Sequence, residues 1–175
     1  MENNKILWVV MGVSGCGKST VGQALALARG VPFIEGDEYH PASNVAKMSA
    51  GQPLDDDDRA DWLRALRTEV RGARDSGTGL VLSCSALKRG YRDLLREADP
   101  ALRFAHLDGP RALIAARMQA RVDHYMPPSL LDSQFRDLQP LQADEAGISL
   151  DIRLAPADLV AAILGNERGR PDAGG

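Results

Sequence analysis

The sequence is poor in cysteine, in basic charge and in long hydrophobic runs. Its two cysteines, Cys16 and Cys84, cannot form a disulfide framework, and neither belongs to a cysteine and histidine cluster with zinc-ligand spacing, so both are expected to be reduced thiols. The formal net charge of -3 provides no basic field for nucleic acid or an anionic membrane. The apolar run at residues 6–11 is far shorter than the roughly 20 residues of a membrane span and lacks the pattern of a secretory signal. We therefore expect a cytoplasmic protein with no nucleic-acid or membrane partner.

Continuous apolar runs alternate along the chain with segments of helical period. This order is typical of an α/β fold in which helices cover a parallel sheet. Strands are expected at residues 6–11, 31–34, 80–84, 104–107 and 148–152. Helices are expected at residues 19–29, near 44–49, from 55 to 72–77, around 91–95, at 111–122, near 130–138 and at 158–164. With 175 residues, we predict one three-layer domain over residues 1–165 with about five strands, followed by a flexible tail at 166–175.

The most specific motif lies between the first expected strand and the first expected helix. Residues 12–19 read Gly-Val-Ser-Gly-Cys-Gly-Lys-Ser, which fits the phosphate-binding loop (P-loop) pattern G-x-x-x-x-G-K-[ST] in its required context. Inward backbone N–H groups and the Lys18 ammonium would hold the phosphates, and the Ser19 hydroxyl would serve Mg²⁺. A glycine-rich turn without a ligand would explain Gly12 but not Lys18 and Ser19. We assign nucleotide binding to Gly12, Val13, Ser14, Gly15, Cys16, Gly17, Lys18, Ser19 and Thr20, with Cys16 expected to be a small packing residue.

The P-loop leaves open where the γ-phosphoryl group goes: to water, to a nucleotide or to a small hydroxyl compound. The chain is short for a motor protein, and it lacks the Asn/Thr-Lys-x-Asp motif that reads guanine in GTPases. Its third expected strand, residues 80–84, ends in hydroxyls and a thiol, where many P-loop proteins place a magnesium-binding carboxylate. Glu35 and Asp37, after the second strand, are the candidate replacements.

Further segments resemble the small P-loop gluconokinases of bacteria. They include residues 36–48, 51–54, 56–59, 62–63, 83–88, 91–92, 124–126, 131 and 133–135. The similarity extends to about Glu145, and His-Pro-x-x-Asn at 40–44 and Ser-Ala-Leu-Lys at 85–88 are not general P-loop features. The resemblance implies ATP-dependent phosphorylation of the 6-hydroxyl of D-gluconate to 6-phospho-D-gluconate, with Mg²⁺, on a fold similar to shikimate and nucleoside monophosphate kinases. A homodimer is also a family-based expectation.

Phosphoryl transfer requires a group that orients the acceptor hydroxyl. Asp37 follows the carboxyl end of the second strand, so we predict that it holds this hydroxyl and acts as general base. The alternative for Asp37 is a cap of the following loop. Glu35 is a candidate to hold Mg²⁺ with Ser19, although it also fits a simple strand end.

The carboxylate of gluconate requires a cation on the acceptor side. Arg59 could supply a bidentate fork and Lys88 a point charge. For Arg59 the alternative is an ion pair with residues 55–58, an acidic run that we interpret mainly as a helix cap. Further substrate-side candidates are Lys47, His40 and Arg92, whereas His106 is expected in the core.

Arg117 and Arg121 lie one helical turn apart, before a hinge-like segment. In related kinases the corresponding segment closes over ATP, so we predict a lid at residues 122–135, a substrate-side segment at 37–54, nucleotide binding by Arg117 and a catalytic charge from Arg121. A solvated helix face is the alternative for both arginines. Asp123, where the family is expected to have a small residue, places a negative charge near this lid.

Two other functions remain open from the residues alone. A few substitutions can change which small acid a carboxylate-binding pocket accepts. A kinase for another small sugar acid or a shikimate-like acceptor is therefore the first alternative. A nucleotide-binding regulator without transfer activity is the second alternative. The many polar side chains between Asp37 and Lys88 disfavour it, because a regulator needs no group that holds an acceptor hydroxyl.

Overall fold

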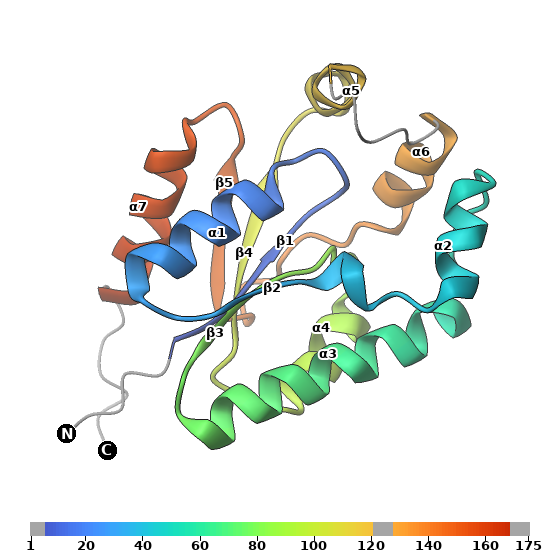
Figure 1. Ribbon diagram of the computed structural model, residues 1–175. Helices are drawn as coiled ribbons and strands as arrows, with labels where there is room; N and C mark the ends of the chain where they lie inside the picture. Colours follow the sequence, from blue (N-terminus) through green and yellow to red (C-terminus); the bar gives the residue numbers. More distant parts are fainter. Residues whose placement is uncertain (1–5, 121–127, 169–175) are drawn as a thin grey trace.

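Five strands form one parallel sheet in the computed structural model, which describes residues 6–120 and 128–168. The strands are β1 (Leu7–Met11), β2 (Phe33–Glu35), β3 (Leu80–Ser83), β4 (Arg103–Asp108) and β5 (Gly147–Asp151). Their spatial order is β2-β3-β1-β4-β5 (Figure 1). The predicted α/β fold with a five-stranded parallel sheet is thereby confirmed.

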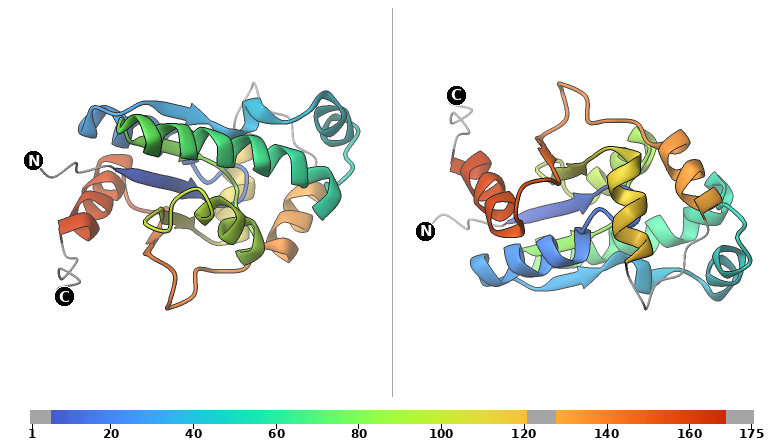
Figure 2. Two further views of the ribbon diagram at one scale, coloured as in Figure 1. Left: turned by 90° about the horizontal axis from the view of Figure 1, so that it is seen from below. Right: turned by 90° about the horizontal axis from the view of Figure 1, so that it is seen from above.

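Helices cover both faces of this sheet. They are α1 (Lys18–Arg29), the short 3₁₀ helix η1 (Gly36–Tyr39), α2 (Ala42–Ser49), α3 (Asp56–Ser76), α4 (Arg89–Arg96), α5 (Arg111–Gln119), α6 (Pro128–Asp137) and α7 (Pro156–Arg168). The two views in Figure 2 place the sheet between α1 and α7 on one side and α3 and α4 on the other. None of these helices is both long enough and apolar enough to cross a membrane.

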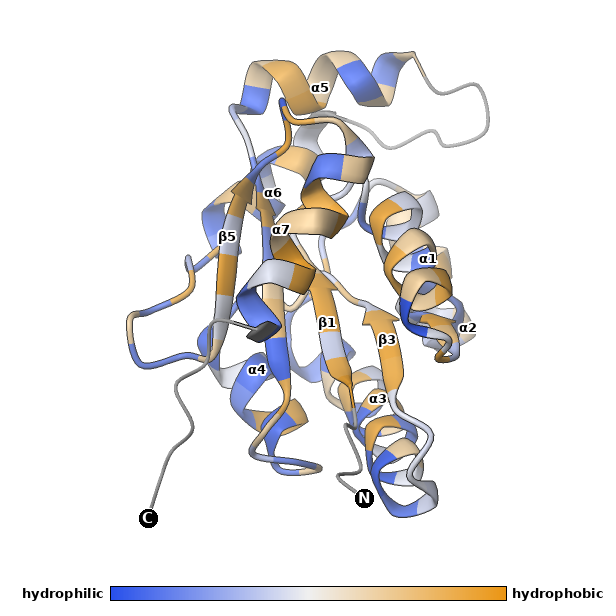
Figure 3. Ribbon diagram, turned by 90° about the vertical axis from the view of Figure 1, so that its left-hand side faces the viewer, coloured by the Kyte–Doolittle hydropathy of each residue, from blue (hydrophilic) through white to orange (hydrophobic). Residues whose placement is uncertain are grey.

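The alternation of side chains along β1 explains the three layers. Trp8 and Val10 belong to the core under α1 and α7, whereas Val9 and Met11 belong to the core against α3 and α4. All of β1 is buried, and it is coloured mostly hydrophobic in Figure 3. A strand buried on both faces reads as a continuous apolar run, which is why the sequence predicted a central strand here.

The helix boundaries follow local sequence signals. Helix α1 ends at Gly30, whose φ of 65° is the left-handed conformation that glycine tolerates. Helix α3 begins with a capping box, in which the side chains of Asp55 and Asp58 each accept a hydrogen bond from the other residue's backbone N–H. The expected cap function of the acidic run is therefore confirmed.

Several predicted boundaries were wrong by a few residues. β2 begins at Phe33 rather than at residue 31, and η1 was not predicted. η1 begins where Gly36 lies so close to β3 that a β-carbon would be 2.2 Å from the Ser83 carbonyl oxygen. Helix α7 continues to Arg168, so residues 166–168 of the predicted tail are helical.

The strand order creates a crevice at the carboxyl end of β1. β1 lies between β3 and β4 in the sheet. The chain runs from β1 past β3 to β2, and it later crosses from β3 past β1 to β4, so these two connections run in opposite directions along the sheet. In open α/β sheets, ligands bind at such a switch point, outside the carboxyl ends of the strands. Helices α2 and α6 lie beyond this end of the sheet (Figure 1).

Candidate active site

The P-loop links β1 to α1 and has the backbone conformation that its glycines allow. Gly12, Gly15 and Gly17 have φ angles of 146°, 83° and 96°. At Gly12 a β-carbon would lie 2.9 Å from the Leu107 carbonyl oxygen, so both the angle and the close approach require glycine. The Lys18 ammonium donates to the Val13 carbonyl oxygen, 3.0 Å away, across the loop. The predicted strand-loop-helix context of the motif is confirmed.

Cys16 has the small, buried side chain that the sequence analysis expected. It is 2% exposed, and a β-carbon at Gly12 would come within 2.7 Å of its Sγ. Cys84 is buried too, and burial, the largest effect, raises its thiol pKa to about 12. Neither thiol is placed to act as a nucleophile.

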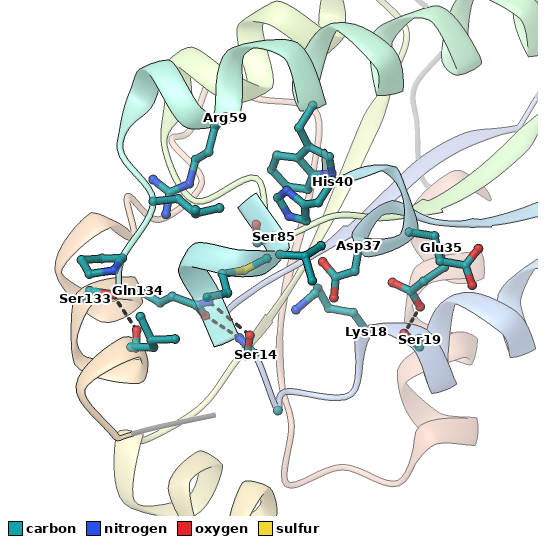
Figure 4. A pocket seen from close by; sticks show the side chains of 18 of the residues that line it. Ser14, Lys18, Ser19, Glu35, Asp37, His40, Arg59, Ser85, Ser133 and Gln134 are labelled. Carbon is teal, nitrogen blue, oxygen red and sulfur yellow. Dashed lines mark hydrogen bonds between the residues drawn. The ribbon is translucent and has the colours of Figure 1, made fainter. Parts of the chain in front are cut away.

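A cavity of about 530 Å³ opens beside the P-loop, at the switch point of the sheet. Its lining combines P-loop residues with residues from η1, α2, α3 and α6. The predicted site residues that it brings together are Ser14, Gly15, Gly17, Lys18, Ser19, Glu35, Asp37, His40 and Arg59. In Figure 4, Lys18 and Asp37 point into a common space.

Glu35 lies between two hydroxyl groups at the end of β2. The Ser19 hydroxyl donates to one of its carboxylate oxygens (Figure 4), and the Ser83 hydroxyl donates to the other at 2.6 Å. β2 and β3 are paired neighbours in the sheet, with Glu35 in register with Ser83. The strand end therefore places a carboxylate directly on the P-loop hydroxyl.

Arg59 is 7% exposed and reaches the pocket from the first turn of α3. Its Nη1 donates to the Tyr91 hydroxyl at 2.9 Å and to the Asp137 carboxylate at 3.1 Å. The Tyr91 hydroxyl in turn donates to Asp56. Within residues 6–120 and 128–168, Arg59 forms its ion pair with Asp137 of α6 and not with residues 55–58, which was the expected alternative.

His40 lies flat against Trp62 in the lining of the pocket. The two ring centroids are 4.1 Å apart with an interplanar angle of 15°. Burial lowers the pKa of His40, the nearby Asp37 carboxylate opposes this, and the Arg59 guanidinium adds to the lowering. Burial disfavours the charged ring, so His40 is neutral near pH 7.

Gln134, on α6, contacts the P-loop directly. Its Oε1 accepts from the Ser14 backbone N–H at 2.7 Å, and its Nε2 donates to the Ser14 hydroxyl at 3.2 Å (Figure 4). The sequence analysis did not name Gln134, Ser133 or Trp62 as site residues, although all three line the pocket. The signals for them were the segments that carry the family resemblance and, for Ser133 and Gln134, the predicted lid at residues 122–135.

Comparison with known proteins identifies the family. Residues 7–141 match the family described as "AAA domain". The gluconokinase of Gluconobacter oxydans is 50% identical over 137 residues, which cover 78% of this chain and 77% of that relative. The thermosensitive gluconokinase of Escherichia coli is 46% identical over 142 residues, covering 81% and 75%. This chain belongs to the gluconokinase family.

Solved structures support both the gluconokinase family and the wider fold. A gluconokinase from Sinorhizobium meliloti has a TM-score of 0.85 and 46% identity, covering 93% of this chain and 92% of that one. The APS kinase CysC of Mycobacterium tuberculosis, at 18% identity and a TM-score of 0.66, shares the fold, with coverage of 94% and 99%. The predicted resemblance and P-loop kinase fold are confirmed.

Arg92 is not on the substrate side of this gluconokinase-family chain, and its prediction as a substrate-binding residue was wrong. It is 0% exposed, and its guanidinium binds the Glu145 carboxylate at 2.7 and 2.9 Å. Its Nη1 also donates to the Ala86 carbonyl oxygen at 2.9 Å. The neighbouring Ser85 carbonyl oxygen accepts from the Gly12 N–H at 3.2 Å. Arg92 thus braces the loop after β3, which in turn supports the P-loop.

Lys47 and Lys88 lie outside the residues that line the cavity. Lys47 donates to the Asp58 carboxylate at 2.6 Å and Lys88 to Asp56 at 2.9 Å. These hydrogen bonds raise the pKa of both lysines. Arg59 lines the cavity and the two lysines do not, so Arg59 is the better placed cation for a ligand carboxylate.

Of the two arginines predicted on the nucleotide side, Arg117 and Arg121, the structure describes Arg117. Arg117 is exposed on α5, and its Nη2 donates to the Ile152 carbonyl oxygen at 2.8 Å, away from the cavity lining. Arg121 and the lid residues 122–127 lie outside the described residues. Thr20 is exposed on α1, and His106 is buried as expected.

Proposed function

We propose that this protein transfers the γ-phosphoryl group of ATP to the 6-hydroxyl of D-gluconate, giving 6-phospho-D-gluconate and ADP. The observation that carries the proposal is the shared cavity. The P-loop Lys18, the exposed Asp37 and the buried Arg59 line one space at the switch point of the sheet. Family membership names the acceptor, since the relatives are gluconokinases.

The donor side follows from the P-loop. The N-terminus of α1 begins at Lys18 and directs backbone N–H groups at bound phosphate. The Lys18 ammonium, held over the loop by the Val13 carbonyl oxygen, is in reach of the β- and γ-phosphates. Residues 12–20 therefore bind the triphosphate, and Lys18 neutralises the charge that moves during transfer.

The acceptor side depends on Asp37 and Arg59. Asp37 accepts the proton of the 6-hydroxyl as that oxygen attacks the γ-phosphorus, and ADP leaves on the opposite side. Arg59 holds the carboxylate of gluconate. Tyr91 and Asp137 both bind its Nη1 atom, which leaves the other guanidinium nitrogens for a ligand in the pocket. With both ends of the sugar acid fixed, the hydroxyl is aimed at the phosphate.

Ser19 and Glu35 fit a magnesium ion. Both offer oxygen atoms, which Mg²⁺ prefers, and they are already in contact with each other. No group of three or more histidine, cysteine or acidic side chains forms a metal cage within residues 6–120 and 128–168. Such a sparse set suits Mg²⁺, which keeps waters and phosphate oxygens as ligands. When bound, the ion neutralises charge on the β- and γ-phosphates.

An acceptor panel tests the proposed function. ADP release is measured with ATP and Mg²⁺ against D-gluconate, other sugar acids, shikimate and a nucleoside monophosphate, and the product is identified by ³¹P NMR. We expect turnover with gluconate and a phosphate ester at C6, both abolished in Lys18→Ala. Rapid turnover on shikimate or a nucleoside monophosphate with none on gluconate would contradict the proposal. Asp57→Asn, an exposed acid at the start of α3, serves as the matched surface control.

Other expectations stay predictions alongside this function. They are a single kinase domain over residues 1–165, a lid at 122–135 with Arg121, nucleotide contact by Arg117, a cytoplasmic location, a homodimer, and no nucleic-acid or membrane partner. The net charge of -3 supports the last of these. Light scattering after gel filtration tests the homodimer.

A further inference from the structure

The ring of His40 is fixed in orientation by its stacking partner. Trp62 lies parallel to it at 4.1 Å, and the Trp62 indole N–H donates to the Gly36 carbonyl oxygen at 2.8 Å. Trp62 is 1% exposed, so this support is part of the core. The imidazole is therefore held flat against a rigid surface, with only its edges free to make polar contacts.

One edge of the ring meets the amide of Asn44, a residue of α2 that is 2% exposed. The Asn44 Nδ2 lies 2.8 Å from the Asp58 backbone carbonyl oxygen and 3.2 Å from the Nδ1 of His40. The Asp58 carbonyl oxygen can only accept a hydrogen bond, so it determines which end of the amide faces it. The reverse orientation would set two acceptor oxygens against each other.

This arrangement decides where the proton of His40 resides. An amide NH₂ has two hydrogens and no acceptor capacity. One hydrogen goes to Asp58, and the other points at Nδ1, so Nδ1 must be the unprotonated nitrogen. A neutral imidazole then carries its hydrogen on Nε2.

The Nε2 atom is available to a ligand. It has no partner among residues 6–120 and 128–168, and it is not one of their buried, unpartnered atoms. His40 lines the cavity, with its ring at the acceptor end near Asp37 (Figure 4). Burial and the Arg59 guanidinium lower the pKa of His40 against the influence of Asp37, which keeps the ring neutral. The charged residues that line the same cavity are Lys18, Glu35, Asp37, Glu38 and Arg59.

We propose that Asn44 is a positioning residue that holds His40 as the Nε2–H tautomer, and that this N–H donates to a hydroxyl oxygen of the sugar acid. A neutral donor suits a hydroxyl, whereas the guanidinium of Arg59 suits the carboxylate. The identity of the ligand rests on the proposed function. The tautomer does not, because it follows from contacts within the protein.

The tautomer is tested without any substrate. The chain has three histidines, so long-range ¹H–¹⁵N spectra of the unmodified protein are simple, and His40→Gln identifies the His40 signals. At pH 7.5 we expect the pattern of an Nε2–H imidazole with an unprotonated Nδ1. An Nδ1–H pattern, or a doubly protonated ring, would overturn the inference.

Asn44→Asp tests the positioning role. Its carboxylate can only accept, so it draws a proton to Nδ1 and should raise the pKa of His40 by about one unit or more. At a pH above this raised pKa, where the ring is neutral with its proton on Nδ1, the loss of the Nε2 donor is expected to raise KM for gluconate about tenfold, with kcat and KM for ATP little changed. His40→Phe keeps the stack on Trp62 but removes the donor, and should have the same effect. Ser43→Ala, exposed on α2 beside Asn44, is the control and should leave all constants unchanged.

A double variant separates this role from damage to α2. Because Asn44 acts through His40, adding Asn44→Asp to His40→Phe should raise KM for gluconate no further. Multiplied effects would show an independent structural role and overturn the assignment. If the unmodified protein has the Nε2–H tautomer but His40→Phe leaves KM for gluconate unchanged, the substrate contact is refuted. The proposed phosphorylation of gluconate would still stand. Failure of the unmodified protein to phosphorylate gluconate would instead refute the proposed function.

Discussion

Replacing Glu145 by glutamine should destabilise the protein strongly, although Glu145 lies away from the cavity. Its carboxylate is fully enclosed and accepts from Arg92 at 2.7 and 2.9 Å, from the Gln142 N–H at 2.8 Å and from Arg96. This cluster ties α4 to the chain before β5. The Arg92 guanidinium is 0% exposed, so Glu145→Gln leaves a buried positive charge without its counter-ion.

The size of the effect follows from the pKa of Glu145. Burial alone would raise this pKa, but the hydrogen bonds from Arg92 and Gln142 and the charges of Arg92 and Arg96 outweigh it and lower the value from 4.5 to about 2. A pKa lowered by this much corresponds to roughly 3 kcal/mol of folding free energy at pH 7. Removing one partner of a buried pair typically costs about 3–5 kcal/mol, which agrees with this figure. The folded pKa is lowered, so this stabilisation is complete above about pH 4.5 and is lost as the pH falls toward 2.

Urea denaturation at pH 7 and at pH 3 measures this contribution. We expect Glu145→Gln to lower the free energy of unfolding by about 3 kcal/mol at pH 7 and by less at pH 3. The matched control is Asp144→Asn, since Asp144 is an exposed neighbour paired with Arg89 at 2.7 Å and should cost less than about 1 kcal/mol. A loss below 1 kcal/mol for Glu145→Gln, or the same loss at both pH values, would refute the reasoning.

Three further predictions concern the site itself. Asp37→Asn should lower kcat about 10²- to 10⁴-fold with little change in ATP affinity, as measured by steady-state kinetics and calorimetry; equal turnover would remove its role as base. Arg59→Met should raise KM for gluconate on the order of 10- to 100-fold, because it removes a charge-assisted contact, and an unchanged KM would assign the carboxylate to another cation. Chelation with EDTA should stop ADP release, and Mg²⁺ should restore it; activity that persists in EDTA would contradict a magnesium site at Ser19 and Glu35.

Most of the fold could be predicted because its signals are local. The apolar run of β1, the glycine at the end of α1 and the acidic cap of α3 each lie within a few residues of the boundary that they specify. The η1 turn was missed because its cause is not local: Gly36 is required by contact with Ser83, which lies on another strand. An isolated glycine after a strand carries no sign of that contact.

The candidate site was predictable where one motif carries the chemistry. In the P-loop, every group predicted to bind phosphate belongs to one continuous segment, so spacing alone specifies the motif. Glu35 and Asp37, which line the cavity, were predicted by the related rule that functional side chains follow the carboxyl ends of parallel strands. The Gln134 contact with Ser14 joins residues 120 positions apart, and no local pattern encodes it.

The sequence alone determined that this chain folds as a parallel α/β sheet with a P-loop at the end of its first strand, because periodicity and motif spacing are properties of neighbouring residues. Only the tertiary structure distinguished the arginines. Arg59 and Arg92 both lie in the first half of a helix, yet Arg59 lines the cavity and Arg92 is enclosed in the core. Their acidic partners, Asp137 and Glu145, are 78 and 53 residues away in sequence. Whether a charged side chain binds a ligand or braces the fold depends on its burial and its counter-ion, and both are set by distant segments that meet only after folding.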